Sequence, residues 1–131
     1  VGETTARTPI IDKSWLTPGC GLVTMHSGEV CEEVFLSADG VAADYWTQLK
    51  KHVNPLAKLT QEGKLDEANI IDLSELVLGE KKLRTSDDQF VAAASMGLGA
   101  LDIMIAYQMY LNACEKGIGT KVNLWDKPLW E

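Results

Sequence analysis

The chain has 131 residues, of which 46% are hydrophobic and 24% are charged, and this composition is typical of a globular domain with its own core. Its net charge of −7 and the lack of a large basic cluster argue against a nucleic-acid-binding protein, because phosphate backbones are held by basic patches. No apolar run approaches the roughly 20 residues of a membrane span, no secretory leader opens the sequence, and the three cysteines are widely spaced, so we expect a cytoplasmic protein with reduced thiols and no metal centre.

The first half of the sequence alternates between apolar runs and helix signals. Residues 1–6, rich in Val and Thr, are expected to form the end of a strand. Residues 20–25 are a short apolar run bounded by turn signals, which is typical of a buried strand. Ser27 is expected to cap a helix over residues 30–37, and residues 41–45 are expected to form a further strand.

Short helices are expected in the middle of the sequence. Residues 46–53 and 55–62 are separated by Asn54-Pro55, and proline suits the first turn of a helix. The expected elements that follow are a turn at residues 66–71, a helix at 73–78, a charged loop at 80–88 and a strand at 90–94. Strands alternating with helices favour an α/β fold for the first half, and helices dominate the second.

A long helix is expected over residues 100–113, ending before Gly117. Its strongly polar residues, Asp102, Gln108 and Asn112, do not share one stripe, so the helix is apolar around most of its circumference. Such a helix is expected to be buried in a core or in a subunit interface. The tail after it contains Trp125 and Trp130, which suggests that the tail docks on another surface.

Several short motifs follow one another along nearly the whole chain. They are TTARTP at residues 4–9, WLTPG at 15–19, SADGVAAD at 37–44, LSELVLG at 73–79, RTSDDQ at 84–89, and SMG at 95–97 with ALD at 100–102. In this order and spacing they resemble the C-terminal part of the ornithine cyclodeaminase/mu-crystallin family of NAD(P)-dependent proteins. The RTSDD and WLTPG stretches weigh most in this resemblance.

The resemblance implies an α/β fold made of the C-terminal part of a Rossmann-like NAD(P)-binding domain, followed by helices that return to a dimerisation domain. Residues 1–64 would belong to the Rossmann-like domain, and residues 65–131 would form a helical segment associated with the dimerisation and substrate domain. Family members are more than twice as long, and no G-x-G-x-x-G fingerprint follows a strand here, so the chain is expected to be a fragment. A homodimer or larger homo-oligomer is implied.

The residues that the resemblance places in the cofactor cleft, with NAD or NADP as the cofactor, are Thr4, Thr5, Ala6, Ser95, Met96 and Gly97. Open α/β sheets bind ligands at strand ends, but threonines there can also be merely structural. The glycines after residue 94 let a backbone approach a ligand closely, and a helix N-terminus attracts negative or carbonyl groups. The alternative is a turn whose glycines only pack a helix. By resemblance, this turn would lie beside the nicotinamide ring.

Two residues are catalytic candidates. His26 follows a buried strand and can shuttle a proton near neutral pH, although a lone histidine is more often structural. It lies nearest the position where the family's cyclodeaminases carry an aspartate. Asp87, beside Asp88, could face a substrate amine, but adjacent carboxylates in extended chain point in different directions, so capping is the alternative.

The first functional hypothesis, by resemblance, is a segment of an NAD(P)-dependent dehydrogenase or ornithine cyclodeaminase that acts on a small amino or imino acid when intact. The histidine in place of the aspartate makes a relative that reduces or oxidises an amino or imino acid at least as suitable as a cyclodeaminase. The second hypothesis is a non-enzymatic ligand-binding or oligomer-forming module of the mu-crystallin type, which the apolar helix at residues 100–113 would suit.

Overall fold

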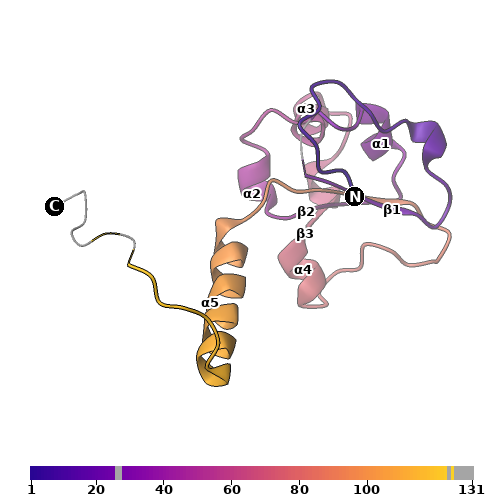
Figure 1. The fold of residues 1–131 in the computed structure, drawn as a ribbon. Coiled ribbons are helices and arrows are strands. Elements are labelled where there is room, and N and C mark those ends of the chain that lie inside the picture. The colour runs from indigo at the N-terminus through magenta and orange to yellow at the C-terminus, as the bar shows by residue number, and fades with distance from the viewer. Residues whose placement is uncertain (26–27, 124, 126–131) are drawn as a thin grey trace. The chain divides into compact units, whose positions relative to one another are not determined.

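The computed structural model describes residues 1–25, 28–123 and 125. Within these residues, four parallel strands form one sheet in the order β1-β4-β2-β3: β1 (Gly21–Thr24), β2 (Gly40–Ala43), β3 (Ile70–Asp72) and β4 (Val91–Ala94) (Figure 1). The strand latest in sequence, β4, lies between β1 and β2 and pairs with both. The predicted α/β fold is confirmed, and the parallel strands place all their carboxyl ends on one edge of the sheet.

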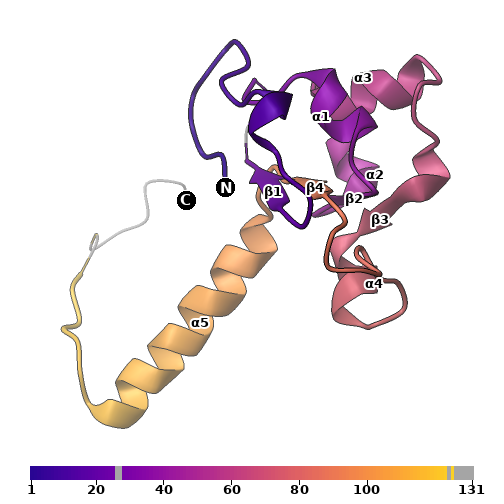
Figure 2. The same cartoon turned by 90° about the vertical axis from the view of Figure 1, so that its right-hand side faces the viewer.

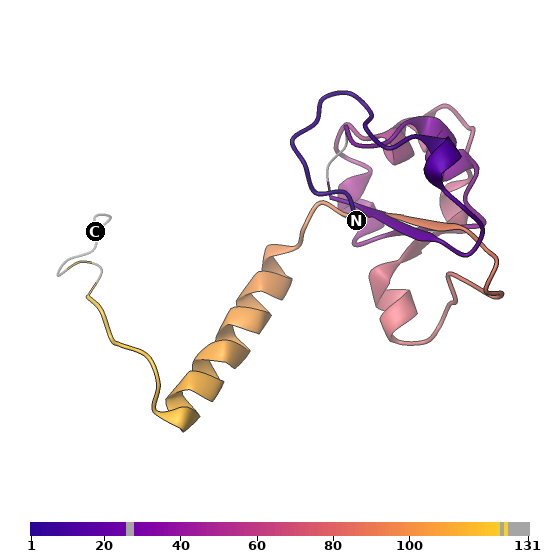
Figure 3. The ribbon, with the colours of Figure 1, turned by 45° about the vertical axis from the view of Figure 1, so that its right-hand side comes forward.

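Short helices connect the strands and cover the sheet. They are α1 (Glu32–Leu36), α2 (Trp46–Leu49), α3 (Pro55–Gln61) and α4 (Leu73–Val77), with 3-10 turns η1 (Lys13–Trp15) and η2 (Glu67–Asn69). α1 and α3 lie together on one face of the sheet, and α4 lies on the opposite side (Figures 1 and 3). β1 is an edge strand of the sheet. There Gly2 forms a parallel bridge with Thr24, which places the N-terminal residues beside β1 (Figure 2).

The core lies between the sheet and the helices α1 and α3. In β1, Leu22 is buried whereas the next residue, Val23, is 37% exposed, as expected for a strand with one covered face. The helices contribute Phe35, Leu56 and Leu59, none of which is more than 1% exposed. Burial of an apolar side chain of this size stabilises the fold by about 1.5–3 kcal/mol.

Asn54 separates two of these helices. Its side-chain oxygen accepts a hydrogen bond from the Ala57 N–H at 2.8 Å and so caps α3, with Pro55 in the first turn. Its Nδ2 donates to the carbonyl oxygens of Leu49 and His52, both at 2.9 Å. The helix expected over residues 46–53 ends at Leu49, whose carbonyl oxygen accepts the His52 N–H at 3.1 Å in a tighter turn as well as Asn54 Nδ2.

Two other expectations differ from the structure. Residues 66–71, expected to form a turn, contain η2 and the start of β3, which pairs with β2 through Val41 and Ile70. A strand of three residues is too short to show a hydrophobic period, so its pairing depends on the neighbouring strand. The helix expected over residues 30–37 begins only at Glu32, and its expected cap, Ser27, lies outside the described residues.

The chain divides into two compact units, Val1–Gly97 and Leu98–Glu131. The sheet lies in the first unit, so β3 and β4, which follow residue 64, pair there with the earlier strands. The association of residues 65–131 with a dimerisation domain stays a prediction.

The second unit contains the long helix α5 (Gly99–Lys116), which ends, as expected, at Gly117 with a φ of 63°. No residue of α5 is buried, so the expectation that this helix lies in a core is wrong for the described part of the chain. Burial in a subunit interface stays a prediction. The expected docking of the tail also stays a prediction: Trp125 is 47% exposed, and Trp130 lies outside the described residues. None of the helices in the described ranges is both long and apolar enough to cross a membrane.

Phe35→Ala is expected to lower the free energy of unfolding by about 3–5 kcal/mol, because it leaves a cavity at a position that is 1% exposed. Leu36→Ala, at the next position of α1, is the control. It is expected to cost about 0.5 kcal/mol or less, since Leu36 is 47% exposed. Urea unfolding followed by tryptophan fluorescence measures both values, and equal losses would contradict the assignment of Phe35 to the core.

Candidate functional site

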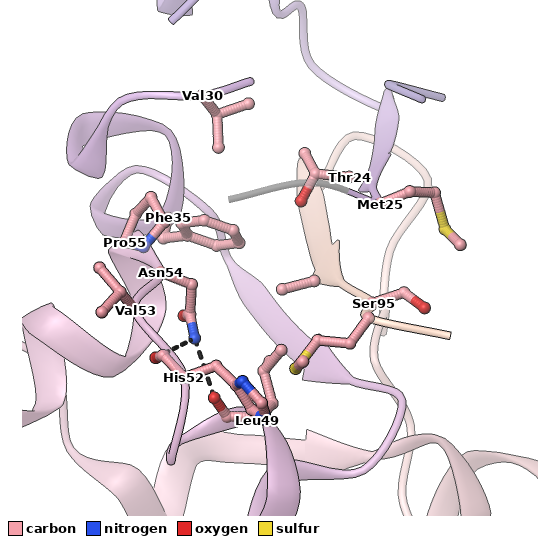
Figure 4. A pocket seen from close by; sticks show the side chains of 12 residues that line it. Thr24, Met25, Val30, Phe35, Leu49, His52, Val53, Asn54, Pro55 and Ser95 are labelled. Atoms are coloured by element: carbon pink, nitrogen blue, oxygen red, sulfur yellow. Dashed lines mark hydrogen bonds between the residues drawn. The ribbon is translucent and has the colours of Figure 1, made fainter. Parts of the chain in front are cut away.

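A cavity of about 330 Å³ opens at the carboxyl ends of β1 and β4. The segment that joins α2 to α3 forms its other side, and the Phe35 ring faces its interior (Figure 4). Thr24 and Ser95 bring hydroxyl groups to a wall that is otherwise largely apolar. The described residues that line the cavity include no Lys, Arg, Asp or Glu, and His52 is their titratable side chain. An apolar cavity with few polar groups is the usual form of a small-molecule site.

The turn after β4 is held by Asp44, which directly follows β2. Asp44 Oδ2 accepts hydrogen bonds from Ser95 Oγ at 2.8 Å, from the Met96 N–H at 2.8 Å and from the Gly97 N–H at 3.1 Å. Its Oδ1 accepts the Tyr45 N–H at 2.7 Å. Bonds to a carboxylate are stronger than bonds between neutral groups. This one side chain therefore fixes the turn at the rim of the cavity.

A second carboxylate, Glu29, holds the neighbouring edge. Glu29 is fully buried; its Oε1 accepts the Thr4 N–H at 2.5 Å and its Oε2 accepts the Met25 N–H at 3.2 Å. Gly2 lies so close that an added Cβ would be 2.7 Å from Glu29 Oε2. The Glu29 carboxylate thus joins the N-terminal segment to the residue that follows β1.

The structure separates the six residues that were predicted to contact a cofactor. Ser95 and Met96 line the cavity, and Gly97 is next in the same turn. The other three, Thr4, Thr5 and Ala6, lie in the segment that Glu29 holds beside the end of β1, and they do not line the cavity. The turn's amides at positions 96 and 97 donate to Asp44 instead of being free for a ligand.

The two catalytic candidates have different outcomes. His26 lies outside the described residues. Asp87 is exposed and precedes β4, so it lies at the edge that carries the amino ends of the strands. There the Gly19 N–H donates to the Asp88 carbonyl oxygen at 2.8 Å, and Arg84 donates to the Gly19 carbonyl oxygen at 2.8 Å.

The sequence reasoning missed Asp44 and Glu29 as site residues. For Asp44 a signal existed, because it ends the motif at residues 37–44 and directly follows an apolar strand. For Glu29 no signal existed, since a glutamate near a helix start usually indicates an exposed first turn. Its burial depends on contacts with residues 2–4, which the sequence pattern does not reveal.

Cys31 is close to this region but is not suited to nucleophilic chemistry. Burial raises the pKa of the Cys31 thiol above its ordinary value, and the nearby Glu33 carboxylate raises it further. A higher pKa leaves less of the reactive thiolate at neutral pH. Within the described residues, no three or more His, Cys, Asp and Glu side chains are grouped so that they could hold a metal ion.

Comparison with known proteins identifies relatives over nearly the whole chain. It is 35% identical over 118 residues to N-((2S)-2-amino-2-carboxyethyl)-L-glutamate dehydrogenase of Staphylococcus aureus, which covers 89% of this chain and 35% of that protein. It is 25% identical over 127 residues to Delta(1)-pyrroline-2-carboxylate reductase of Bacillus cereus, which covers 93% of this chain and 39% of that protein. The chain therefore spans well under half the length of these relatives. No family model matches the sequence.

Solved structures share the fold. Delta(1)-pyrroline-2-carboxylate reductase of Thermococcus litoralis, in complex with NADH and L-proline, superposes with a TM-score of 0.73 at 29% identity, covering 91% of this chain and 38% of that one. A probable ornithine cyclodeaminase from Bordetella pertussis superposes with a TM-score of 0.70 at 23% identity, covering 90% and 40%. These matches extend the likeness from sequence to the arrangement of the strands.

Glu29→Ala is expected to lower the free energy of unfolding by about 3 kcal/mol, because two backbone amides lose a charged acceptor in a buried setting. Glu80→Ala, an exposed position in a loop, is the control and is expected to change stability by about 0.5 kcal/mol or less. Urea unfolding measures both. Hydrogen exchange at the amides of Thr4 and Met25 is expected to accelerate in Glu29→Ala alone, and unchanged exchange there would rule out the assigned contacts.

Proposed function

Because this chain belongs to the ornithine cyclodeaminase/mu-crystallin family, we propose that it forms part of an NAD(P)-dependent oxidoreductase that acts on a small amino or imino acid. Its substrate would carry the reacting C–N bond next to a carboxylate. The proposal concerns the whole protein, since the chain covers 35% and 39% of the two curated relatives named above.

The observation that carries this proposal is the chemistry shared by the named relatives. A dehydrogenase of N-((2S)-2-amino-2-carboxyethyl)-L-glutamate and a reductase of Delta(1)-pyrroline-2-carboxylate both interconvert a secondary amine and an imine beside a carboxylate. The structure of the latter enzyme type contains NADH and L-proline, which is itself a secondary amine. We therefore favour an imine or secondary amine of an amino acid over ornithine as the substrate class.

The geometry of this chain fits the ring end of a nicotinamide cofactor. Ligands of open α/β sheets bind outside the carboxyl ends of the strands, where the strand order reverses. Here the chain passes from β1 over to β2 and β3 and then returns with β4 between β1 and β2, and the cavity lies at that point. Its volume of about 330 Å³ and apolar lining suit a planar ring.

When bound, NAD(P)H would supply the hydride, and the residues of this chain would supply shape and orientation. Phe35, Leu49 and Val30 form an apolar wall that excludes water from the cavity. Asp44 holds the turn at its rim in one conformation. Preorganised walls of this kind reduce the entropy lost when the reactants are aligned.

The assembly and location of the whole protein are also proposals. α5 exposes apolar side chains around its circumference, among them Ile103, Met104 and Ile105, each more than 60% exposed, which suits burial in a homodimer or larger oligomer. Residues 65–131 would then associate with the dimerisation domain. The free cysteines suit a reducing compartment, so we propose a cytoplasmic protein. The same exposed helix would serve the alternative function, a ligand-binding or oligomer-forming module of the mu-crystallin type.

The proposal predicts that the 131-residue chain binds NADH or NADPH weakly, with a dissociation constant of about 1 mM, and shows no turnover alone. The binding is expected to be weak because a dinucleotide fingerprint is absent from this sequence. Met96→Trp is expected to weaken binding about tenfold or more by filling the cavity, since Met96 lines it and is 40% exposed. Leu78→Trp, 71% exposed in the loop after α4, is the control.

Isothermal titration with both nucleotides measures this affinity. The accompanying assay follows NAD(P)H oxidation with Delta(1)-pyrroline-2-carboxylate. Binding that Met96→Trp does not change would place the cofactor elsewhere. Absence of any affinity would favour the non-enzymatic alternative, and turnover by the chain alone would contradict the expected dependence on further residues.

A further inference from the structure

The turn over residues 95–97 is unusual in what it offers to a ligand. A glycine-containing turn after a strand commonly presents backbone amides, which bind phosphates and carboxylates. Here the amides of Met96 and Gly97 and the hydroxyl of Ser95 all donate to the single oxygen Oδ2 of Asp44. The turn has thus used its donors within the chain.

The groups that remain at this rim are acceptors. The Ser95 N–H donates to the Thr24 carbonyl oxygen at 2.8 Å, which removes one more donor. Within the described part of the chain, the carbonyl oxygens of Ser95 and Met96 accept no hydrogen bond from another residue. The hydrogen-bonding groups of Ser95 and Met96 that stay unused within the described chain are therefore carbonyl oxygens, which accept.

The surroundings of the cavity reinforce this polarity. Its described lining residues include no Lys or Arg that could neutralise an anion. Across the cavity mouth, the amide of Met25 is likewise taken by a carboxylate, that of Glu29. An anion that approached this turn would come close to the Asp44 carboxylate, and like charges repel one another.

We propose that Asp44 is a positioning residue that decides which ligand chemistry this rim accepts. By taking the amides of Met96 and Gly97, it turns residues 95–97 into an acceptor surface. This surface binds a neutral hydrogen-bond donor, such as a primary carboxamide, and excludes carboxylates and phosphates. The proposal rests on the proposed function in one respect: the nicotinamide end of NAD(P) carries such a carboxamide, and the charged parts of cofactor and substrate must then bind to other residues.

Two ligands that differ only in this group test the proposal. Nicotinamide carries a neutral carboxamide, and nicotinic acid carries a carboxylate on the same ring. Each is titrated into isotope-labelled chain, and the amide resonances of residues 94–97 are followed by NMR. Nicotinamide is expected to bind about tenfold or more tightly than nicotinic acid, because the carboxylate lacks a donor and meets like charge.

Asp44→Asn is expected to reduce this preference to about twofold or less. The variant loses the charge, and its new side-chain NH₂ is a donor that cannot accept from the turn's amides. A purely structural role would weaken both ligands together and leave their ratio unchanged. Asp39→Asn is the matched control. Asp39 precedes β2, and its Oδ2 accepts the Phe90 N–H at 2.8 Å at the amino end of the same strand pair. Asp39→Asn removes the same charge from a carboxylate that accepts the same kind of bond but does not line the cavity, and the preference is expected to persist.

The outcomes separate the two proposals. Equal binding of both ligands to the wild-type chain, binding of neither, or loss of the preference in Asp39→Asn as well would overturn the role of Asp44. An equal affinity of the wild-type chain for both ligands overturns the proposal even if Asp44→Asn fails to fold. If NADH binds in the calorimetric titration but nicotinic acid binds as tightly as nicotinamide, the proposed function stands and the inference about Asp44 fails. If the chain prefers nicotinamide but does not bind NADH, the inference about Asp44 stands and the proposed function fails.

Discussion

The structure depends on the pairing of β4 with two strands that are distant from it in sequence. β4 aligns Ala94 with Thr24 on one side and with Ala43 on the other, so three strand ends meet at one edge. On its way to β4 the chain passes the start of β2, where Gly40 has no side chain to obstruct it. A Cβ at Gly40 would be 2.2 Å from the Leu83 carbonyl oxygen. A side chain at position 40 would therefore collide with the segment that leads into β4.

Acidic side chains then determine the character of that edge. Two aspartates at this edge hold the start of α2: Asp44 Oδ1 accepts the Tyr45 N–H at 2.7 Å, and Asp72 Oδ1, at the end of β3, accepts the Trp46 N–H at 2.6 Å. Glu29 likewise accepts a backbone amide, that of Thr4, from a fully buried position. Carboxylates with several N–H partners are well stabilised as anions, and they hold loops rigidly. The edge is therefore ordered by carboxylates within the chain, whereas the described lining of its cavity includes no Lys, Arg, Asp or Glu.

Much of the fold could be predicted from the sequence because local signals were strong. The apolar runs before residues 25 and 95 predicted β1 and β4, and Asn54-Pro55 predicted the start of α3. The two failures had different causes. β3 is three residues long and depends on its pairing with β2, whereas α2 ends at Leu49, whose carbonyl oxygen accepts from both the His52 N–H and Asn54 Nδ2. For the long apolar helix, the sequence correctly indicated its extent and its end at Gly117.

The sequence by itself determined the α/β class and the family, because these follow from strand periodicity and motif order, and its glycines predicted a turn at residues 95–97. Only the tertiary structure decided which hydrogen bonds that turn makes. Asp44 lies more than fifty residues before Ser95, and its hydrogen bonds to the turn exist only because β2 and β4 are neighbours in the sheet. Glu29 is buried for the same kind of reason, since its partner Thr4 comes from a separate segment. A hydrogen bond between distant segments has no local pattern, so residue type and spacing along the chain cannot reveal it.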